Sequence, residues 1–340
     1  MNRAVLVSRV SPMVGYIILS GMTLGLFGLA VLEAWTGHPI AGAILTLAGA
    51  GLAFGTAQEG LALHRTGITS TWDVKDLYRF VAVLAGAVIT YILNVDLGLG
   101  AVVASGLVGV LAAVLLPDYG VPLYCGSFVG MASPTLLPNH IGVAAAGAVA
   151  GLVFVLCIDL FDGFGGKLGT IALSGCVLVG LHCGAGFVSL PVLHWHGVEA
   201  WMVIICSALA AIATFYISIH LGRGPVMASG LVGLVGGLLL PPIYPNMGDI
   251  LAVMVICASF AGMSGIRRFS TAAPIAVAGL LAGLLFIYSA PHLGGAGGKL
   301  GTIAFGSVIA VRGVSKLIRA LRELRPASTA RPGIGRSNPS

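Results

Sequence analysis

The segment Cys125-Gly126-Ser127-Phe128-Val129-Gly130-Met131 occurs again 132 residues later (257 − 125) as Cys257-Ala258-Ser259-Phe260-Ala261-Gly262-Met263. A second segment, Gly165-Gly166-Lys167-Leu168-Gly169-Thr170-Ile171-Ala172, returns at the same interval (297 − 165) as Gly297-Gly298-Lys299-Leu300-Gly301-Thr302-Ile303-Ala304. Because one interval relates both pairs, neither copy carries an insertion between them. Each copy combines a glycine-rich break with apolar runs, so the chain contains an internal duplication.

The match extends towards the N-terminus of both copies. Ala104-Ser105-Gly106-Leu107-Val108-Gly109 returns as Ala228-Ser229-Gly230-Leu231-Val232-Gly233, at an interval of 124 residues (229 − 105). The second copy therefore gains eight residues (132 − 124) around positions 244–249. The chain divides into an N-terminal two-helix segment with a cytoplasmic linker (1–72), repeat 1 (73–190), repeat 2 (191–320) and a basic, disordered cytoplasmic tail (321–340).

The composition is that of an integral membrane protein. Hydrophobic residues make up 58% of the chain and charged residues only 8%, whereas soluble domains carry about 25% charged residues. The mean hydropathy is +1.05. The net charge of +6 indicates no nucleic-acid binding, because seven of the 17 Lys and Arg residues lie in the last thirty positions. Such a basic end is typical of a cytoplasmic terminus.

Apolar runs long enough to cross a bilayer, about 20 residues each, predict an all-α polytopic protein. We expect about twelve transmembrane helices, two before the repeats and five in each repeat, interrupted by Gly and Pro. The predicted ranges are 13–33, 40–62, 80–97, 101–116, 120–134, 141–160, 168–187, 200–220, 225–241, 250–266, 273–289 and 300–318.

The helix around Cys125 decides the relative orientation of the repeats. Five helices per repeat would invert the second copy, whereas four would leave both copies in one orientation. This segment is short and bounded by prolines, so a re-entrant helix is the alternative to a span. With five helices and a cytoplasmic N-terminus, Lys299 is the one clearly external cation. A re-entrant helix moves Lys167 and Arg223 outside. The positive-inside rule therefore favours inverted repeats with both termini in the cytoplasm.

The two Gly-Gly-Lys segments are candidate anion sites. Each opens a membrane helix, so free backbone N–H groups and the positive end of the helix dipole face any ligand there. The alternative is a simple turn whose lysine reaches the headgroups. Leu168 stands where a phosphate-binding loop requires Ser or Thr, which excludes a nucleotide site of that type.

The two Cys-x-Ser-Phe segments provide hydroxyls and close backbone approach near the membrane midplane, or else a stripe of small residues between tightly crossed helices. The candidate substrate-binding residues are Cys125, Ser127, Phe128, Gly130, Gly165, Gly166, Lys167 and Thr170 in repeat 1, and Cys257, Ser259, Phe260, Gly262, Gly297, Gly298, Lys299 and Thr302 in repeat 2.

Acidic residues beside apolar runs are candidates for ion coupling. Asp159 and Asp162 lie just before the first Gly-Gly-Lys segment, and repeat 2 has Pro291 and Gly294 in their places. The alternative is that both aspartates are headgroup residues that pair with Lys167. His194-Trp195-His196 and Glu199 form too weak a pattern to predict a metal site. No metal and no cofactor are predicted.

The leading hypothesis is a secondary membrane transporter for a small, anionic solute, with a midplane site between inverted repeats and coupling to protons or sodium. The alternatives are a channel for a small or neutral solute and a non-transporting membrane subunit of a larger complex. No arrangement of residues predicts an enzyme. The expected partners are the lipid bilayer, the solute and a second copy of the chain, and the expected location is the bacterial cytoplasmic (inner) membrane.

Overall fold

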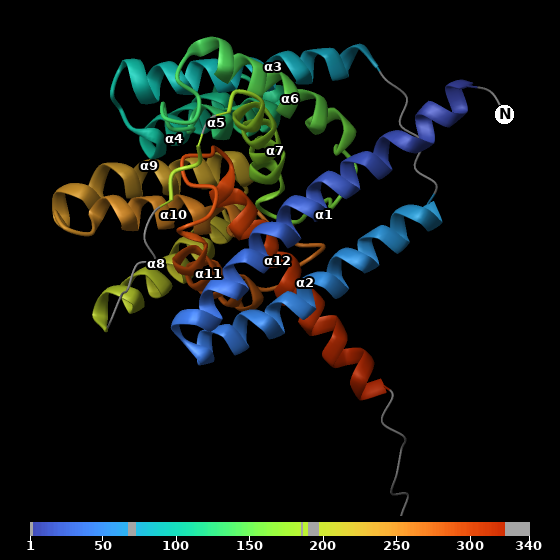
Figure 1. Ribbon diagram of the computed structural model, residues 1–340, viewed down its shortest axis with the longest axis vertical. Helices are drawn as coiled ribbons and strands as arrows, with labels where there is room; N and C mark the ends of the chain where they lie inside the picture. Colours follow the sequence, from blue (N-terminus) through green and yellow to red (C-terminus); the bar gives the residue numbers. More distant parts are fainter. Residues whose placement is uncertain (1–2, 67–72, 185, 190–196, 324–340) are drawn as a thin grey trace, which may run out of the picture.

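The computed structural model describes residues 3–66, 73–184, 186–189 and 197–323. These residues are α-helical almost throughout, with one isolated β-bridge between Val188 and Gly294 and no strand (Figure 1). The helices are α1 (Arg3–Gly37), α2 (Pro39–Thr66), α3 (Val74–Tyr91), α4 (Ala101–Leu115), α5 (Gly120–Gly130), α6 (His140–Leu156), α7 (Lys167–His182), α8 (Val198–Phe215), α9 (Pro225–Ile243), α10 (Gly248–Gly262), α11 (Ala272–Ser289) and α12 (Lys299–Glu323).

Seven stretches among the described residues are long and apolar enough to cross a membrane, which supports the prediction of a helical membrane protein. They contain α1, α2, α3, α8, α9, α11 and α12. Four further apolar helices, α4, α6, α7 and α10, are shorter, with 15 to 17 residues. The helix around Cys125 is the shortest of the described α-helices, because α5 has only 11 residues. At about 1.5 Å per residue, α5 covers roughly half of a hydrocarbon core about 30 Å thick.

The helix ends follow local signals. α3 begins at Val74, six residues earlier than expected (80 − 74), because Asp73 and Asp76 form a capping box that satisfies free N–H groups of the first turn. α5 ends at Gly130 rather than at 134. α12 continues to Glu323 and so includes the first three residues assigned to the tail. Residues 324–340 lie outside the described part of the chain.

The two copies share unusual backbone features. α3 and α8 each end in a five-residue π-helical turn, at Ile92–Asp96 and Tyr216–His220. Phe161 and Leu293, which are equivalent by sequence, have φ angles of 50° and 53°. Such angles are uncommon for residues other than glycine. The matched sequences therefore fold into matched local structures.

α7 and α12 cross in antiparallel directions. A Cβ atom added to Gly166, at the start of α7, would lie 2.5 Å from the backbone N of Phe305 in the second turn of α12. Conversely, a Cβ added to Gly298, at the start of α12, would lie 2.5 Å from the backbone N of Leu173 in the second turn of α7. The first turn of each helix thus lies against the second turn of the other.

α4 and α9 cross in the same way. A Cβ on Gly106 would lie 2.9 Å from the backbone N of Leu234, and a Cβ on Gly230 would lie 3.0 Å from that of Val110. The N-terminal part of each helix therefore faces the C-terminal part of the other. Outside the two copies, α1 and α2 lie side by side along one flank and pack on α12 (Figure 1).

Candidate functional site

The two Cys-x-Ser-Phe segments meet at the centre of the molecule. The rings of Phe128 and Phe260 lie 4.5 Å apart, centroid to centroid. Ser127 shares a 2.8 Å hydrogen bond with Ser105, and Ser259 shares one of the same length with Ser229. All of these side chains are buried. The serine hydroxyls therefore already have protein partners, and the centre is tightly packed.

The cysteines of these segments are buried and bond to the opening turns of the Gly-Gly-Lys helices. The Cys125 thiol donates to the Leu168 carbonyl over 3.4 Å, and the Cys257 thiol donates to that of Leu300 over 3.2 Å. Each thiol thus ties its short central helix to the helix that follows the glycine turn of the same copy. The sequence equivalence of the two copies extends to this contact.

Each glycine turn packs on the central helix of the other copy. A Cβ on Gly165 would lie 2.2 Å from the Phe260 carbonyl oxygen, and a Cβ on Gly297 would lie 2.3 Å from that of Phe128. Only residues without a side chain fit at either position. The ends of α5 and α10, where Gly130 and Gly262 pack against α3 and α8, are therefore covered by backbone from the opposite copy.

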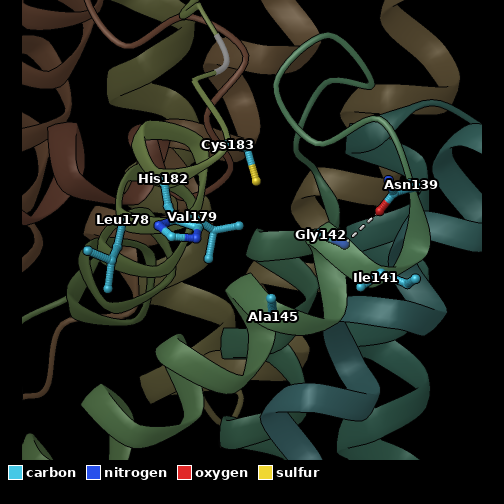
Figure 2. Close-up of a pocket in the computed structure, with 8 residues that line it drawn as sticks. All are labelled: Asn139, Ile141, Gly142, Ala145, Leu178, Val179, His182 and Cys183. Carbon is cyan, nitrogen blue, oxygen red and sulfur yellow. Dashed lines mark hydrogen bonds between the residues drawn. The ribbon is translucent and has the colours of Figure 1, made fainter.

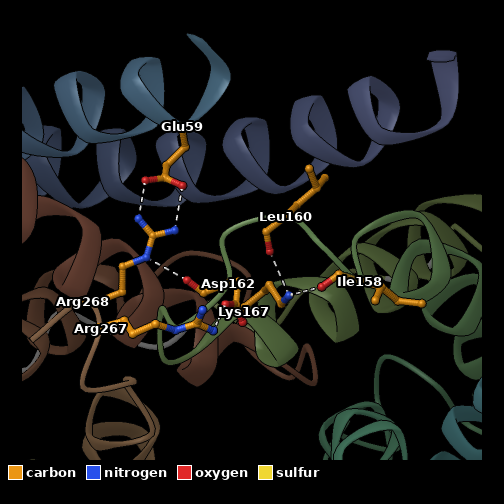
Figure 3. A network of polar contacts seen from close by, with 7 residues as sticks. All are labelled: Glu59, Ile158, Leu160, Asp162, Lys167, Arg267 and Arg268. Carbon is orange, nitrogen blue, oxygen red and sulfur yellow. Dashed lines mark hydrogen bonds and ion pairs between the residues drawn. The ribbon is translucent and has the colours of Figure 1, made fainter. Parts of the chain in front are cut away.

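Both lysines of the Gly-Gly-Lys segments turn back onto the end of the preceding helix. The Lys167 ammonium donates to the carbonyls of Cys157, Ile158 and Leu160 over 3.2, 3.1 and 2.8 Å (Figure 3). The Lys299 ammonium donates to those of Ser289 and Ala290 over 2.7 and 3.4 Å.

These contacts place a cation at the negative end of the dipole of α6 and of α11. In the part of the chain that the structure describes, neither lysine has a carboxylate within ion-pair distance. The direct contacts of the Lys167 and Lys299 ammonium groups are thus to backbone carbonyls.

The first Gly-Gly-Lys segment borders a cavity of about 880 Å³ that both repeats line. Its charged lining comprises Arg79, Lys167, Arg267, Arg268 and Arg312 with Asp118 and Asp162. Much of the remaining wall is apolar, for example Phe154, Ile171 and Val226. Arg79 and Arg268 pair with Asp76 and Glu59, which lie outside the lining, so the five cations meet four acids and a small positive excess remains. The N-terminus of α7 adds to that potential.

Three of the charged lining residues, Asp162, Arg267 and Arg268, belong to one network of ion pairs and hydrogen bonds (Figure 3). Arg268 binds Glu59 of α2 through its two terminal guanidinium nitrogens, over 2.7 and 3.0 Å. Its Nε donates to the Asp162 carbonyl over 2.8 Å. Arg267 donates to the Asp162 carboxylate over 2.8 Å. This network joins the N-terminal helices, the loop after α6 and the loop after α10.

The predicted residues differ in their relation to the cavity. Gly166, Lys167 and Asp162 line it, whereas the other predicted residues of repeat 1 and those of repeat 2 are not among its lining residues. Asp159 is exposed. Thr170 is buried and its hydroxyl has no hydrogen-bond partner among the described residues, whereas the Thr302 hydroxyl donates to the Gly298 carbonyl over 3.2 Å.

A second, smaller cavity of about 530 Å³ lies between α6 and α7 (Figure 2). Its wall is formed mainly by apolar side chains such as Ile141 and Leu178, with His182 and Cys183 at the end of α7. Among the described residues, no group of His, Cys, Asp and Glu is arranged to hold a metal ion. His194 and His196 lie outside the described residues.

The sequence analysis missed two of the residues that shape the charged cavity. Glu59 is not among the predicted residues, although an acid within an apolar helix is itself a signal. Arg268 is not among them either. Comparisons of the chain with protein-family models, with curated proteins and with solved structures found no match.

Proposed function

We propose that this protein is a secondary transporter of a small anionic solute, built from two inverted repeats, and that the cavity at Lys167 is its cytoplasm-facing entrance. The observation that carries the proposal is the positive cavity between the repeats. An anion gains from the excess of cations in the lining and from the positive end of the dipole at the N-terminus of α7.

The antiparallel crossings support inverted topology. Equivalent helices that pack antiparallel are related by a two-fold axis perpendicular to them. If these helices cross the bilayer, that axis lies in the membrane plane, which is the arrangement of inverted-repeat carriers. Twelve spans, including the short α5, remain part of this proposal.

The distribution of charge supports a cytoplasmic position for the cavity. The arginines around it, Arg79, Arg267, Arg268 and Arg312, would all lie on the side that also holds the basic C-terminal end. The positive-inside rule assigns that side to the cytoplasm, with both termini there. In the bacterial inner membrane, the orientation that follows places Lys299 nearer the outer face.

Packing at the centre supports a carrier over an open pore. Gly165, next to the cavity residue Gly166, packs on the Phe260 carbonyl, and the Phe260 ring contacts that of Phe128 at a tilted angle. In the proposed mechanism, one repeat rocks against the other and the solute passes this closed centre when the cavity changes sides. Lys299 then takes the place that Lys167 has in the present state.

Flux measurements on proteoliposomes test the proposal. We would apply concentration jumps of chloride, nitrate, sulfate, formate and inorganic phosphate to wild-type protein on a solid-supported membrane. Lys167→Gln should lower the apparent affinity for the transported anion at least about tenfold, equivalent to roughly 1.4 kcal/mol. Lys167→Arg keeps the charge and should retain more affinity than Lys167→Gln. Lys75→Gln, a change at an exposed lysine of α3, is the matched control.

The outcomes separate the alternatives. Anion flux that Lys167→Gln leaves unchanged refutes the assignment of the site. No flux of any anion in the wild type refutes the function. Unitary conductance far above carrier turnover identifies a channel instead.

A further inference from the structure

Arg312 is a cation without a partner in the wall of the charged cavity. It belongs to α12, one of the seven helices long and apolar enough to cross a membrane. Its Nε is buried without a hydrogen-bond partner, and among the described residues no carboxylate lies within ion-pair distance of its guanidinium. Ionisable groups inside such helices are costly and typically functional. An anion in the cavity would supply the partner that Arg312 lacks.

The other cations of the lining are already engaged. The Lys167 ammonium has three N–H donors, and it donates to three backbone carbonyls. The remaining arginines each pair with a carboxylate: Arg79 with Asp76, Arg267 with Asp162 and Arg268 with Glu59. Of the described lining residues, only Arg312 therefore offers an unengaged guanidinium, whose planar fork matches a carboxylate.

The position of Arg312 separates it from the basic end of the chain. The next residue, Gly313, packs so closely on α2 that a Cβ atom there would overlap the Gly51 carbonyl oxygen. Arg319 and Arg322, further along α12, are exposed and lie outside the cavity lining. The positive-inside rule accounts for those two arginines, but it does not account for a guanidinium in the cavity wall.

The unpaired charges of the lining leave room for one negative charge. Lys167 and Arg312 have no carboxylate partner, and Asp118, an exposed acid, has no cationic partner among the described residues. These three groups together carry one positive charge in excess. A monoanion neutralises that excess, whereas a dianion would leave an uncompensated negative charge, which is costly in a poorly solvated site.

The rest of the wall suits a solute with an apolar body. Of the 23 lining residues, twelve are Val, Leu, Ile, Met, Phe or Pro, and none of the 23 carries a neutral hydroxyl, amide or imidazole side chain. A solute with several hydroxyl groups would lose hydrogen bonds to water without regaining them from side chains. The volume of about 880 Å³ is typical of small-molecule sites, which span about 300–1,000 Å³.

We propose that the transported solute is a small monocarboxylate with an apolar body, and that Arg312 is the residue that binds its carboxylate. This inference deepens the proposed function and rests on it. The two carboxylate oxygens accept hydrogen bonds from the Arg312 guanidinium. Lys167 and the N-terminus of α7 add positive potential, and the hydrocarbon part of the solute lies against the apolar wall.

Equilibrium binding to the purified full-length protein tests this inference, because binding requires no gradient and no flux. The concentration dependence of the thermal unfolding midpoint, at fixed ionic strength, gives the affinity for each anion. From formate through acetate and propionate to butyrate, the affinity should rise roughly two- to fourfold with each added carbon, up to the gain from burying one CH₂ group. Propionamide, which has the body of propionate without its charge, should not bind and controls for partition into detergent.

Two matched pairs of probes test the charge and the polarity of the solute. Succinate has the four carbons of butyrate and a second carboxylate, and glycerate has the three carbons of propionate and two hydroxyl groups. Each should bind at least about fivefold more weakly than its partner, because the lining compensates neither the extra charge nor the hydroxyl groups.

Variants of Arg312 test its role. Arg312→Gln should lower the affinity for propionate at least about tenfold. It should unfold no earlier than the wild type without ligand, because it removes a buried N–H group that has no partner. Arg312→Lys keeps the charge but not the planar fork, so it should lose more affinity for propionate than for chloride. Arg319→Gln, the same change at an exposed position of α12, is the matched control.

The possible results are distinct. A flat series from formate to butyrate, or succinate and glycerate that bind as well as their partners, overturns the substrate class and leaves anion transport in place. Equal propionate affinity in wild type and Arg312→Gln overturns the role of Arg312. Carboxylate binding without flux of any anion in proteoliposomes overturns the proposed function, while the binding series still decides which ligand the cavity takes.

Discussion

The crossing of α7 and α12 predicts a specific energetic coupling between two glycines. A Cβ on Gly169 would lie 2.4 Å from the Gly301 Cα, and a Cβ on Gly301 would lie 2.6 Å from the Gly169 Cα. Ordinary contact begins at 3.4 Å, so the helices must separate by about 1.0 Å (3.4 − 2.4) for Gly169→Ala and about 0.8 Å (3.4 − 2.6) for Gly301→Ala. The obstacle is backbone, which cannot rotate away.

The expected magnitudes follow from two opposing terms. Replacement of a helical glycine by alanine stabilises a helix by about 0.8–1.0 kcal/mol, and overpacking costs about 1–3 kcal/mol. Gly25→Ala in α1 is the matched control, because no atom lies within 4 Å of its added Cβ. Relative to that control, each crossing variant should lower the free energy of unfolding by about 1–3 kcal/mol. The comparison with Gly25→Ala removes the gain in helix propensity, because all of these glycine-to-alanine changes share it.

The double variant distinguishes this crossing from two separate defects. Once the first methyl group has moved the helices apart, the second requires little further movement. Gly169→Ala/Gly301→Ala should therefore cost less than the sum of the single changes, by at least about 0.5 kcal/mol. Reversible unfolding in mixed micelles, titrated with dodecyl sulfate, measures all four variants. Crossing variants as stable as Gly25→Ala, or strictly additive costs, would refute the close antiparallel crossing.

Two further predictions concern the serine pairs and the cavity mouth. Ser229→Ala should destabilise the protein more than Ser105→Ala in the same unfolding assay, because Ser229 also shares a 3.0 Å hydrogen bond with Tyr124. Hydrogen bonds between membrane helices average about 0.6 kcal/mol, so we expect a difference of about that size. Equal losses of unfolding free energy in the two variants would contradict this. Arg267→Gln should change the free energy of unfolding by less than about 1 kcal/mol, since the ion pair of Arg267 is exposed. The same change should slow anion entry in the flux assay, and more so at low salt. An unchanged initial rate at low salt would contradict the electrostatic role.

The sequence predicted the helical membrane class because that class depends on composition and run length. Each of the twelve predicted ranges overlaps an α-helix. The boundaries were harder to predict. The end of α3 depends on a π-helical turn, and α5 stops at Gly130 because Gly130 packs against Ala87 and Thr90 of α3. These helix ends depend on contacts with a neighbouring helix, and the local sequence pattern gives no information about such contacts.

The sequence predicted only those residues of the candidate site whose own sequence neighbours indicate their chemistry. Lys167 and the preceding glycines drew attention through their own sequence, and they border the charged cavity. The partners of Lys167 are carbonyls at the end of α6, which become available only where that helix stops. Glu59 and Arg268 are 209 residues apart, so no spacing rule links them. Whether the predicted residues of both copies bind a solute stays a prediction.

The reciprocal glycine contacts have a consequence for how this architecture could arise. Gly165 packs on residue 260 and Gly297 on residue 128, so this contact from one copy to the other occurs twice. That is the rule of an isologous dimer, in which residue i meets j and j meets i. A single half, inserted in both orientations, could satisfy the same contacts with a second molecule of itself. In the present chain, the covalent connection makes one half the permanent subunit partner of the other.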